Sequence, residues 1–91
     1  MSDKNINEKD IEELHKTILK LQTTEDCKFF FDDLCTNKEI EKMADRLKAA
    51  KLLISGETYN EVIKHTNISS ATLSRVSRCI QYGSGYSKFL K

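Results

Sequence analysis

The sequence has no proline and only three glycines, at positions 56, 83 and 85. These two residue types most often interrupt regular secondary structure, so a chain this poor in them is expected to be all-α. Aromatic residues make up only 8%, while apolar residues at 38% and charged residues at 32% form an ordinary balance for a soluble domain. No apolar run approaches the ~20 residues that a transmembrane helix needs, so no membrane association is expected.

The chain is also short. Ninety-one residues suffice for one small domain, and we expect residues 1–91 to form it, with residues 1–6 disordered. A domain of this size buries only about 60–65% of its unfolded surface, so a monomer would be marginally stable. The first residues, MSDKNINEKD, are polar and acidic and do not resemble a secretory signal. A cytoplasmic location is therefore expected.

Patterns typical of catalytic and metal sites are missing. Cys27, Cys35 and Cys79 are odd in number and lack metal-ligand spacing, and neither His15 nor His65 neighbours a cysteine in sequence. No Ser/His/Asp, Cys/His or phosphate-loop arrangement is present. We therefore expect reduced, partly buried cysteines, no metal, no resident cofactor and no enzyme activity.

Acidic residues are missing from the last third of the chain. Residues 1–35 hold five lysines and nine acids, a net charge of −4, whereas residues 36–91 hold ten basic residues and five acids, a net charge of +5. Glu61 is the last acid, and after it come Lys64, Arg75, Arg78, Lys88 and Lys91. A basic end on a nearly neutral protein can orient toward a polyanion, although chance unevenness in a short chain is the alternative.

The N-terminal region carries an apolar stripe. Ile11, Leu14, Ile18 and Leu21 are spaced three, four and three residues apart, which predicts one helix with charges on its other sides. So narrow a stripe is typical of a seam between two helices. The helix could fold back on its own domain or pair with a second chain, and the small size of the domain favours the second.

Three consecutive phenylalanines follow in a short helix that Thr23 or Thr24 caps. Phe29, Phe30 and Phe31 point about 100° apart and cannot share one face of a helix. An exposed triplet would form a sticky surface patch. We therefore interpret the three rings as core plus dimer interface, rather than as a platform for stacking a ligand.

A long helix is predicted over about 37–54. The stretch "TNKE" at 36–39 has the pattern of a capping box, in which Thr36 caps the helix and Glu39 reaches back. Apolar residues recur at helical spacing after it, and Gly56 ends the helix.

A helix-turn-helix is predicted over about 58–82. "TYNE" is a second capping-box pattern, and the short helix that it starts is broken by "HTN". Asn67 or Ser69 then starts another helix, and Ile68 is expected to fill the turn. Two short helices joined by a tight turn are typical of this DNA-binding motif.

The second helix of the motif has two unlike faces. Leu73, Val76 and Ile80 fall within an arc of about 60° and are expected to pack inward. The opposite face has small side chains at the start of the helix. A major groove about 12 Å wide can accept a helix whose first side chains are small, and their hydroxyl and methyl groups can then contact base edges. A polar, capped amphipathic helix is the alternative, but the preceding helix and the acid-free end favour DNA. The exposed face collects Ala71, Ser74, Arg75 and Arg78.

The stretch CTNKEIEKMADRLKAAKLLISGETYNEVIKHTNISSATLSRVSRCIQYG, from Cys35 to Gly83, resembles the Trp repressor family. It is most similar to the Trp-repressor-related branch called YerC/YecD. Its most specific parts are T-x-x-E from Thr36, "GE" at 56–57 and "ATLSR" at 71–75. The resemblance implies an intertwined all-α homodimer, in which the N-terminal helices of one chain pack against the other, and double-stranded DNA as the partner.

The resemblance also implies a ligand site. In Trp repressors an indole ligand lies between two arginines beside the helix-turn-helix, and Arg46 and Arg75 match them. Val76 stands where the family has a glycine that leaves room beside the ring, so tryptophan is not the expected corepressor. The residues that match the site are Thr36, Arg46, Thr72, Arg75 and Cys79, the last in place of a serine.

For DNA, the resemblance implies a basic contact by Lys64, while Ala71 and Ser74 match the groove-facing front of the second helix. We therefore expect a homodimeric, sequence-specific DNA-binding regulator of transcription, and the resemblance implies a repressor. One alternative is a repressor that needs a small ligand other than tryptophan, held by Arg46 and Arg75; another is a protein-interaction dimer without DNA binding. The expected DNA-binding residues are Lys64, Ser69, Ser70, Ala71, Thr72, Ser74, Arg75 and Arg78.

Overall fold

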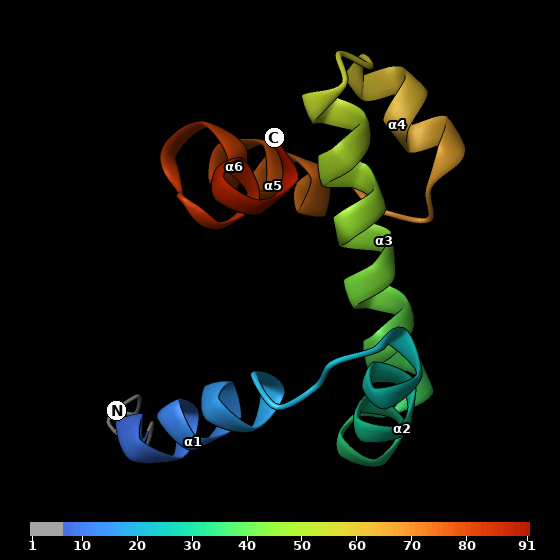
Figure 1. The fold of residues 1–91 in the computed structure, drawn as a ribbon. Helices are drawn as coiled ribbons and strands as arrows, with labels where there is room; N and C mark the ends of the chain where they lie inside the picture. Colours follow the sequence, from blue (N-terminus) through green and yellow to red (C-terminus); the bar gives the residue numbers. More distant parts are fainter. Residues whose placement is uncertain (1–6) are drawn as a thin grey trace. The chain divides into compact units, whose positions relative to one another are not determined.

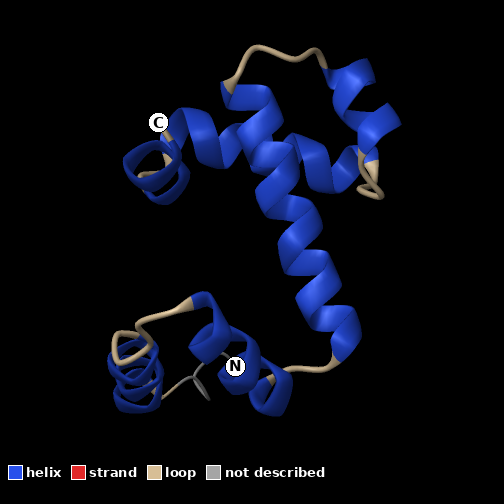
Figure 2. Ribbon diagram, turned by 45° about the vertical axis from the view of Figure 1, so that its right-hand side comes forward, coloured by secondary structure: helices blue, strands red, loops and turns tan. Residues whose placement is uncertain are grey.

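A computed structural model describes residues 7–91. This part of the chain is helical and contains no strand, which confirms the predicted all-α class (Figures 1 and 2). None of its helices is long and apolar enough to cross a lipid bilayer. The predicted disorder of residues 1–6 falls outside the described residues. The helices are α1 (Glu8–Ile18), α2 (Thr24–Leu34), α3 (Asn37–Ile54), α4 (Tyr59–His65), α5 (Ser70–Tyr82) and α6 (Gly85–Leu90).

The helices belong to two compact units. One holds α1 and α2, and the other, Thr36–Lys91, holds α3 to α6. The folding of residues 1–91 as a single domain stays a prediction.

In the first unit, both helices start at a side-chain cap. The Asn7 side chain accepts hydrogen bonds from the backbone N–H groups of Lys9 and Asp10, at 2.9 and 3.3 Å. Thr23, rather than Thr24, caps α2, because its Oγ1 accepts from the Asp26 N–H at 2.9 Å. Helix α1 ends at Ile18, so the predicted stripe is wrong at Leu21, which lies beyond the helix.

No residue of α1 or α2 is buried in the single chain. Ile11 and Leu14 are 41% and 37% exposed, and Phe29 is 63% exposed. Phe30 and Phe31 are half-buried and pack edge to face, with ring centroids 5.5 Å apart. The prediction that the triplet supplies a core is therefore wrong for one chain, while its role in a dimer stays a prediction.

In the second unit, the predicted capping box at the start of α3 is confirmed. The Glu39 N–H donates to Thr36 Oγ1 at 3.1 Å, and the Thr36 N–H donates to Glu39 Oε1 at 2.8 Å. The helix ends at Ile54, as predicted, and Gly56 follows with a φ of +102°, a conformation that favours glycine. The capping box thus defines the start of α3, and the backbone conformation of Gly56 allows the chain to turn away after its end.

The second capping-box pattern forms only one of its two bonds. Thr58 Oγ1 accepts from the Glu61 N–H at 3.2 Å, whereas the Glu61 carboxylate lies 3.4 Å from His65 Nε2 within α4. The helix ends at His65, and the Thr66 hydroxyl donates to the Val62 carbonyl at 2.7 Å.

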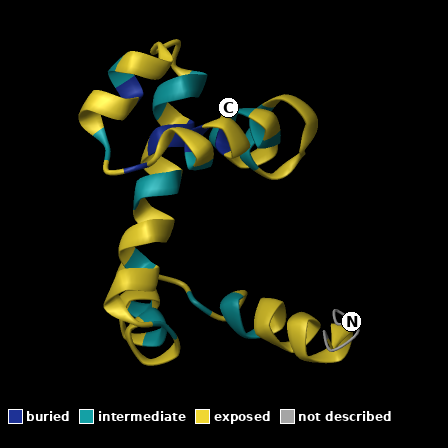
Figure 3. Cartoon of the chain, turned by 180° about the vertical axis from the view of Figure 1, so that it is seen from behind, coloured by how far each residue is buried: buried dark blue, intermediate teal, exposed yellow. Residues whose placement is uncertain are grey.

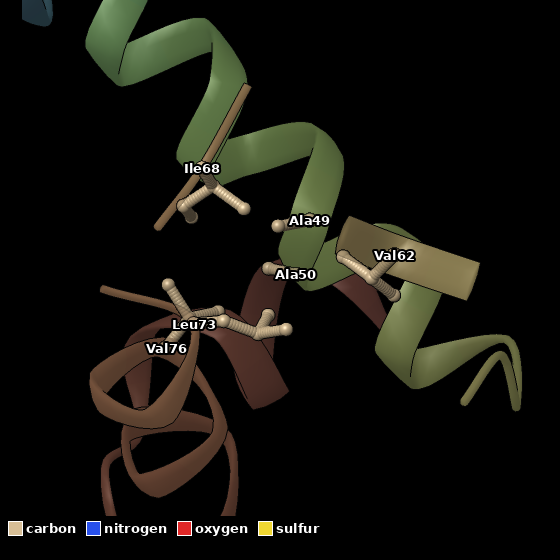
Figure 4. Packing of buried hydrophobic residues seen from close by; sticks show 6 residues of the cluster. All are labelled: Ala49, Ala50, Val62, Ile68, Leu73 and Val76. Atoms are coloured by element: carbon tan, nitrogen blue, oxygen red, sulfur yellow. The ribbon is translucent and has the colours of Figure 1, made fainter. Parts of the chain in front are cut away.

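The core of this unit forms where α5 crosses α3 (Figure 3). Ala49 and Ala50 lie on α3, and their small side chains leave room for the larger residues of the motif. Figure 4 shows the buried aliphatic side chains of α4, the turn and α5 gathered around the two alanines. The inward face predicted for α5 is confirmed, because Leu73 and Val76 are buried and Ile80 packs against them. The buried set is Ala49, Ala50, Val62, Ile68, Leu73 and Val76.

Helix α6 was not expected from the sequence. The Gly83 N–H donates to the Cys79 carbonyl at 2.9 Å, which ends α5. The Ser87 hydroxyl then donates to the Ile80 carbonyl at 2.9 Å and ties α6 to α5. Tyr86 and Leu90 pack against the core as a result.

Candidate nucleic-acid interface and ligand cavity

The helix-turn-helix is formed by α4, the turn 66–69 and α5. Ser69, not Asn67, caps α5: its Oγ accepts from the Thr72 N–H at 3.2 Å and donates to Thr72 Oγ1 at 3.0 Å. Ile68 is 8% exposed and fills the turn, as predicted. The cap and the buried isoleucine together fix where α5 starts relative to α3.

Seven of the eight predicted DNA-binding residues lie on the surface. Thr72 is the exception, because it is half-buried and its hydroxyl is engaged by the cap. The others come from the end of α4 and from the exposed side of α5. They are Lys64, Ser69, Ser70, Ala71, Ser74, Arg75 and Arg78.

This surface is positively charged. Within residues 36–91 the structure gives one ion pair, between His65 and Glu61. Glu61 is the last acid of the chain, and its carboxylate pairs with His65. No carboxylate of residues 36–91 lies within 4.0 Å of Lys64, Arg75 or Arg78. The arrangement can attract a polyanion and contact it along α5.

Beside α5 lies a cavity of about 450 Å³, here called the arginine cavity. It brings together four of the five predicted ligand residues. Thr36 is not among them: it caps α3 ten residues before Arg46, about 15 Å away along the helix axis. The lining consists of Arg46, Thr72, Arg75, Val76, Cys79 and Tyr86.

Val76 and Tyr86 form parts of the wall of the arginine cavity. Val76 is only 2% exposed and packs beside Leu73, so it serves both the core and the cavity wall (Figure 4). Tyr86 enters from α6 and was missed from the sequence. The four-residue spacing of Tyr86 and Leu90 was the signal that could have identified it.

A second cavity, of about 390 Å³, lies between α3 and the turn of the motif. It shares Arg46 and Thr72 with the arginine cavity. Lys42 and Asp45 line it as well, although no sequence pattern singled out either residue. We name it the α3–turn recess; its lining is Lys42, Asp45, Arg46, Asn67, Ile68, Ser69 and Thr72.

The remaining sequence features do not converge on a site. Cys27 is exposed, contrary to the predicted partial burial, whereas Cys35 and Cys79 are half-buried; all three are free thiols. Over residues 7–91 no cluster of three or more His, Cys, Asp or Glu side chains is arranged to hold a metal ion.

Known proteins are similar to this chain in sequence and in fold. Residues 9–91 match the family model described as Trp repressor protein. The chain is 47% identical over 75 residues to the uncharacterised protein YerC of Bacillus subtilis (strain 168), covering 82% of this chain and 72% of YerC.

Two solved structures resemble this chain over most of its length. A "putative Trp repressor" from Staphylococcus aureus superposes with a TM-score of 0.87 at 38% identity, covering 99% of this chain and 91% of that one. A TrpR-like protein from Eubacterium eligens ATCC 27750 gives 0.83 at 37% identity, covering 88% and 84%. The all-α, Trp-repressor-like fold that the resemblance implied is thus confirmed, while the intertwined dimer stays a prediction.

Proposed function

We propose that this chain, which belongs to the Trp repressor family, is a homodimeric regulator of transcription that binds double-stranded DNA sequence-specifically. The observation that carries the proposal is the exposed side of α5, which has small side chains at its front, arginines a turn later and no neighbouring acid.

The front of α5 suits entry into a major groove. Ser70, Ala71 and Ser74 are exposed and short, so the helix backbone can approach base edges in a groove about 12 Å wide. Serine hydroxyls can donate to or accept from bases, and an alanine methyl can contact the methyl group of thymine. These side chains supply the contacts that distinguish one sequence from another.

Basic residues around this front suit the phosphate backbone. Lys64 lies in the last turn of α4, and Arg75 and Arg78 lie further along α5; all three are exposed. Each phosphate that they neutralise releases counterions, so the affinity should fall as the salt concentration rises. Such contacts orient the protein on the duplex without reading the bases.

Dimerisation would cover apolar surface that one chain leaves in water. Ile11, Leu14 and Phe29 are at least one-third exposed in the first unit, as are Met43 and Leu47 on α3. Exposed apolar side chains of this kind can supply the centre of a protein–protein interface. A symmetric dimer should favour a pseudo-palindrome with half-sites about 34–36 Å apart, one helical turn of DNA.

Selection of bound fragments from a random DNA pool tests the proposal. We expect a pseudo-palindrome to be enriched, and Ser74→Ala to change the base preference at one position by roughly 1–3 kcal/mol. Lys64→Ala should instead weaken binding to all sequences and lower the salt slope by about one. If no fragment is enriched even at low salt, the proposal fails; the dimer fraction and melting temperature of each variant are the controls.

The arginine cavity supports a second candidate, a regulator that responds to a small ligand. Arg46 and Arg75 both line it, and no carboxylate of residues 36–91 pairs with either guanidinium. The two groups suit a small aromatic acid other than tryptophan, because Val76 narrows the space beside them. Thermal-shift measurements with a panel of indole and benzoic acids test this, since a ligand bound by the native state raises its stability. If none raises it, the candidate is rejected.

A further inference from the structure

The α3–turn recess carries two cations from one helix. Lys42 and Arg46 are four residues apart, so they lie on neighbouring turns of the same side of α3. Lys42 is exposed and Arg46 is half-buried, and both line the recess. Polar groups face them from the motif turn, where Asn67, Ser69 and Thr72 complete the wall.

These cations are not neutralised by direct contact. Asp45 is the one acid in the recess, and no carboxylate within residues 36–91 lies within 4.0 Å of Lys42 or Arg46. The three charged side chains therefore leave a net charge of +1 beside hydroxyl and amide groups. Lysine and arginine with neighbouring hydroxyls are the groups that proteins use to bind phosphate.

The recess also lies next to the proposed DNA-reading surface. Asn67 and Ser69 line it, and Ser70 and Ala71, at the exposed front of α5, follow directly in the chain. A duplex that receives the front of α5 in its major groove must pass a phosphate strand along the flank of that helix.

We propose that the α3–turn recess binds a phosphate group of the DNA backbone through Lys42 and Arg46, and so fixes the register of α5 in the groove. This inference rests on the proposed function and adds α3 to the interface. Asp45 repels the same phosphate, so the recess holds it less tightly than its two cations alone would. Lys42 should therefore raise the affinity for DNA and Asp45 should lower it. A purely structural role for either residue would not produce these opposite effects.

Fluorescence anisotropy on two duplexes, the selected sequence and a scrambled one, tests the inference between 50 and 200 mM salt. Lys42→Gln should weaken binding to both duplexes about threefold to tenfold at the low salt concentration, and lower the salt slope by about one. Asp45→Asn should tighten binding to both. The matched control is Lys51→Gln. Lys51 is exposed, and it lies nine residues after Lys42 on α3, on about the opposite side of the helix. Its replacement should leave the salt slope unchanged.

The outcomes separate the two proposals. If the wild-type protein prefers its selected duplex but Lys42→Gln behaves like Lys51→Gln, the recess does not bind DNA and only this inference is overturned. If the wild-type protein binds neither duplex at 50 mM salt, the proposed function and the inference both fail. The inference would also be overturned if Asp45→Asn bound the duplexes more weakly than the wild-type protein.

A second measurement separates DNA from a free phosphate compound. The melting temperature is compared in inorganic phosphate and in chloride at equal ionic strength. If phosphate stabilises the wild-type protein but not Lys42→Gln, and the salt slope on DNA is the same for both, the recess serves a free phosphate and the DNA assignment is overturned. Equal melting temperatures in the two salts, with a reduced slope for Lys42→Gln, support the assignment.

Discussion

Replacing Val76 by alanine should destabilise the protein and widen the arginine cavity together. Val76 is 2% exposed and packs in the core beside Leu73 while lining the cavity. Alanine removes two methyl groups, at roughly 0.8 kcal/mol each, and leaves a void that adds to the loss. The expected cost is about 2 kcal/mol. In a domain of this size, that corresponds to a fall in melting temperature of roughly 8–16 °C.

Alanine is a better probe of the cavity than the glycine of Trp repressors. Val76→Gly would lose the same packing and add about 1 kcal/mol, because glycine weakens the middle of a helix. Tryptophan should bind the wild-type protein weakly or not at all, and Val76→Ala should bind it more tightly, since the space beside the two arginines is larger.

Circular dichroism melting and calorimetric titration with tryptophan provide the two readouts. Ile63→Ala is the control: it deletes more atoms, but at a position 38% exposed, and should cost less. A Val76→Ala protein that melts within about 2 °C of the wild type would show that Val76 is not a core residue. Tight, saturable tryptophan binding by the wild-type protein would refute the crowding argument.

Two further predictions concern the dimer and α6. The wild-type protein should sediment as a dimer at micromolar concentration, and Phe29→Ser should weaken the dimer about tenfold, since it removes an exposed aromatic anchor; a wild-type monomer at every concentration would contradict this. Gly83→Ala should cost about 1–3 kcal/mol and speed hydrogen exchange in α6, because its Cβ would lie 2.8 Å from the Cys79 carbonyl oxygen. Gly85→Ala, whose Cβ meets nothing within 4 Å, is the matched control, and equal behaviour of the two variants would refute the steric argument.

The sequence was informative wherever structure is set by neighbouring residues. The start of α3 was predictable because the bonds of the capping box join Thr36 and Glu39, three residues apart. The buried side of α5 was predictable because Leu73 and Val76 recur at helical spacing.

Features that depend on contacts between distant residues were not predictable. Helix α6 has six residues and begins at a glycine, so its stability comes from packing and from the bond between Ser87 and the Ile80 carbonyl. The α3–turn recess joins Asp45 to Asn67, and only the crossing of α3 and the motif brings those residues together.

The most direct test of the central claim, that the front of α5 enters the major groove, is the affinity of Ala71→Glu for the selected DNA. Ala71 is exposed and is not among the buried core residues, so the variant should fold and dimerise like the parent. A long, negatively charged side chain against base edges and phosphates should abolish specific binding. If Ala71→Glu is folded and dimeric, yet binds the selected duplex as tightly as the parent at the same salt concentration, α5 does not enter the groove.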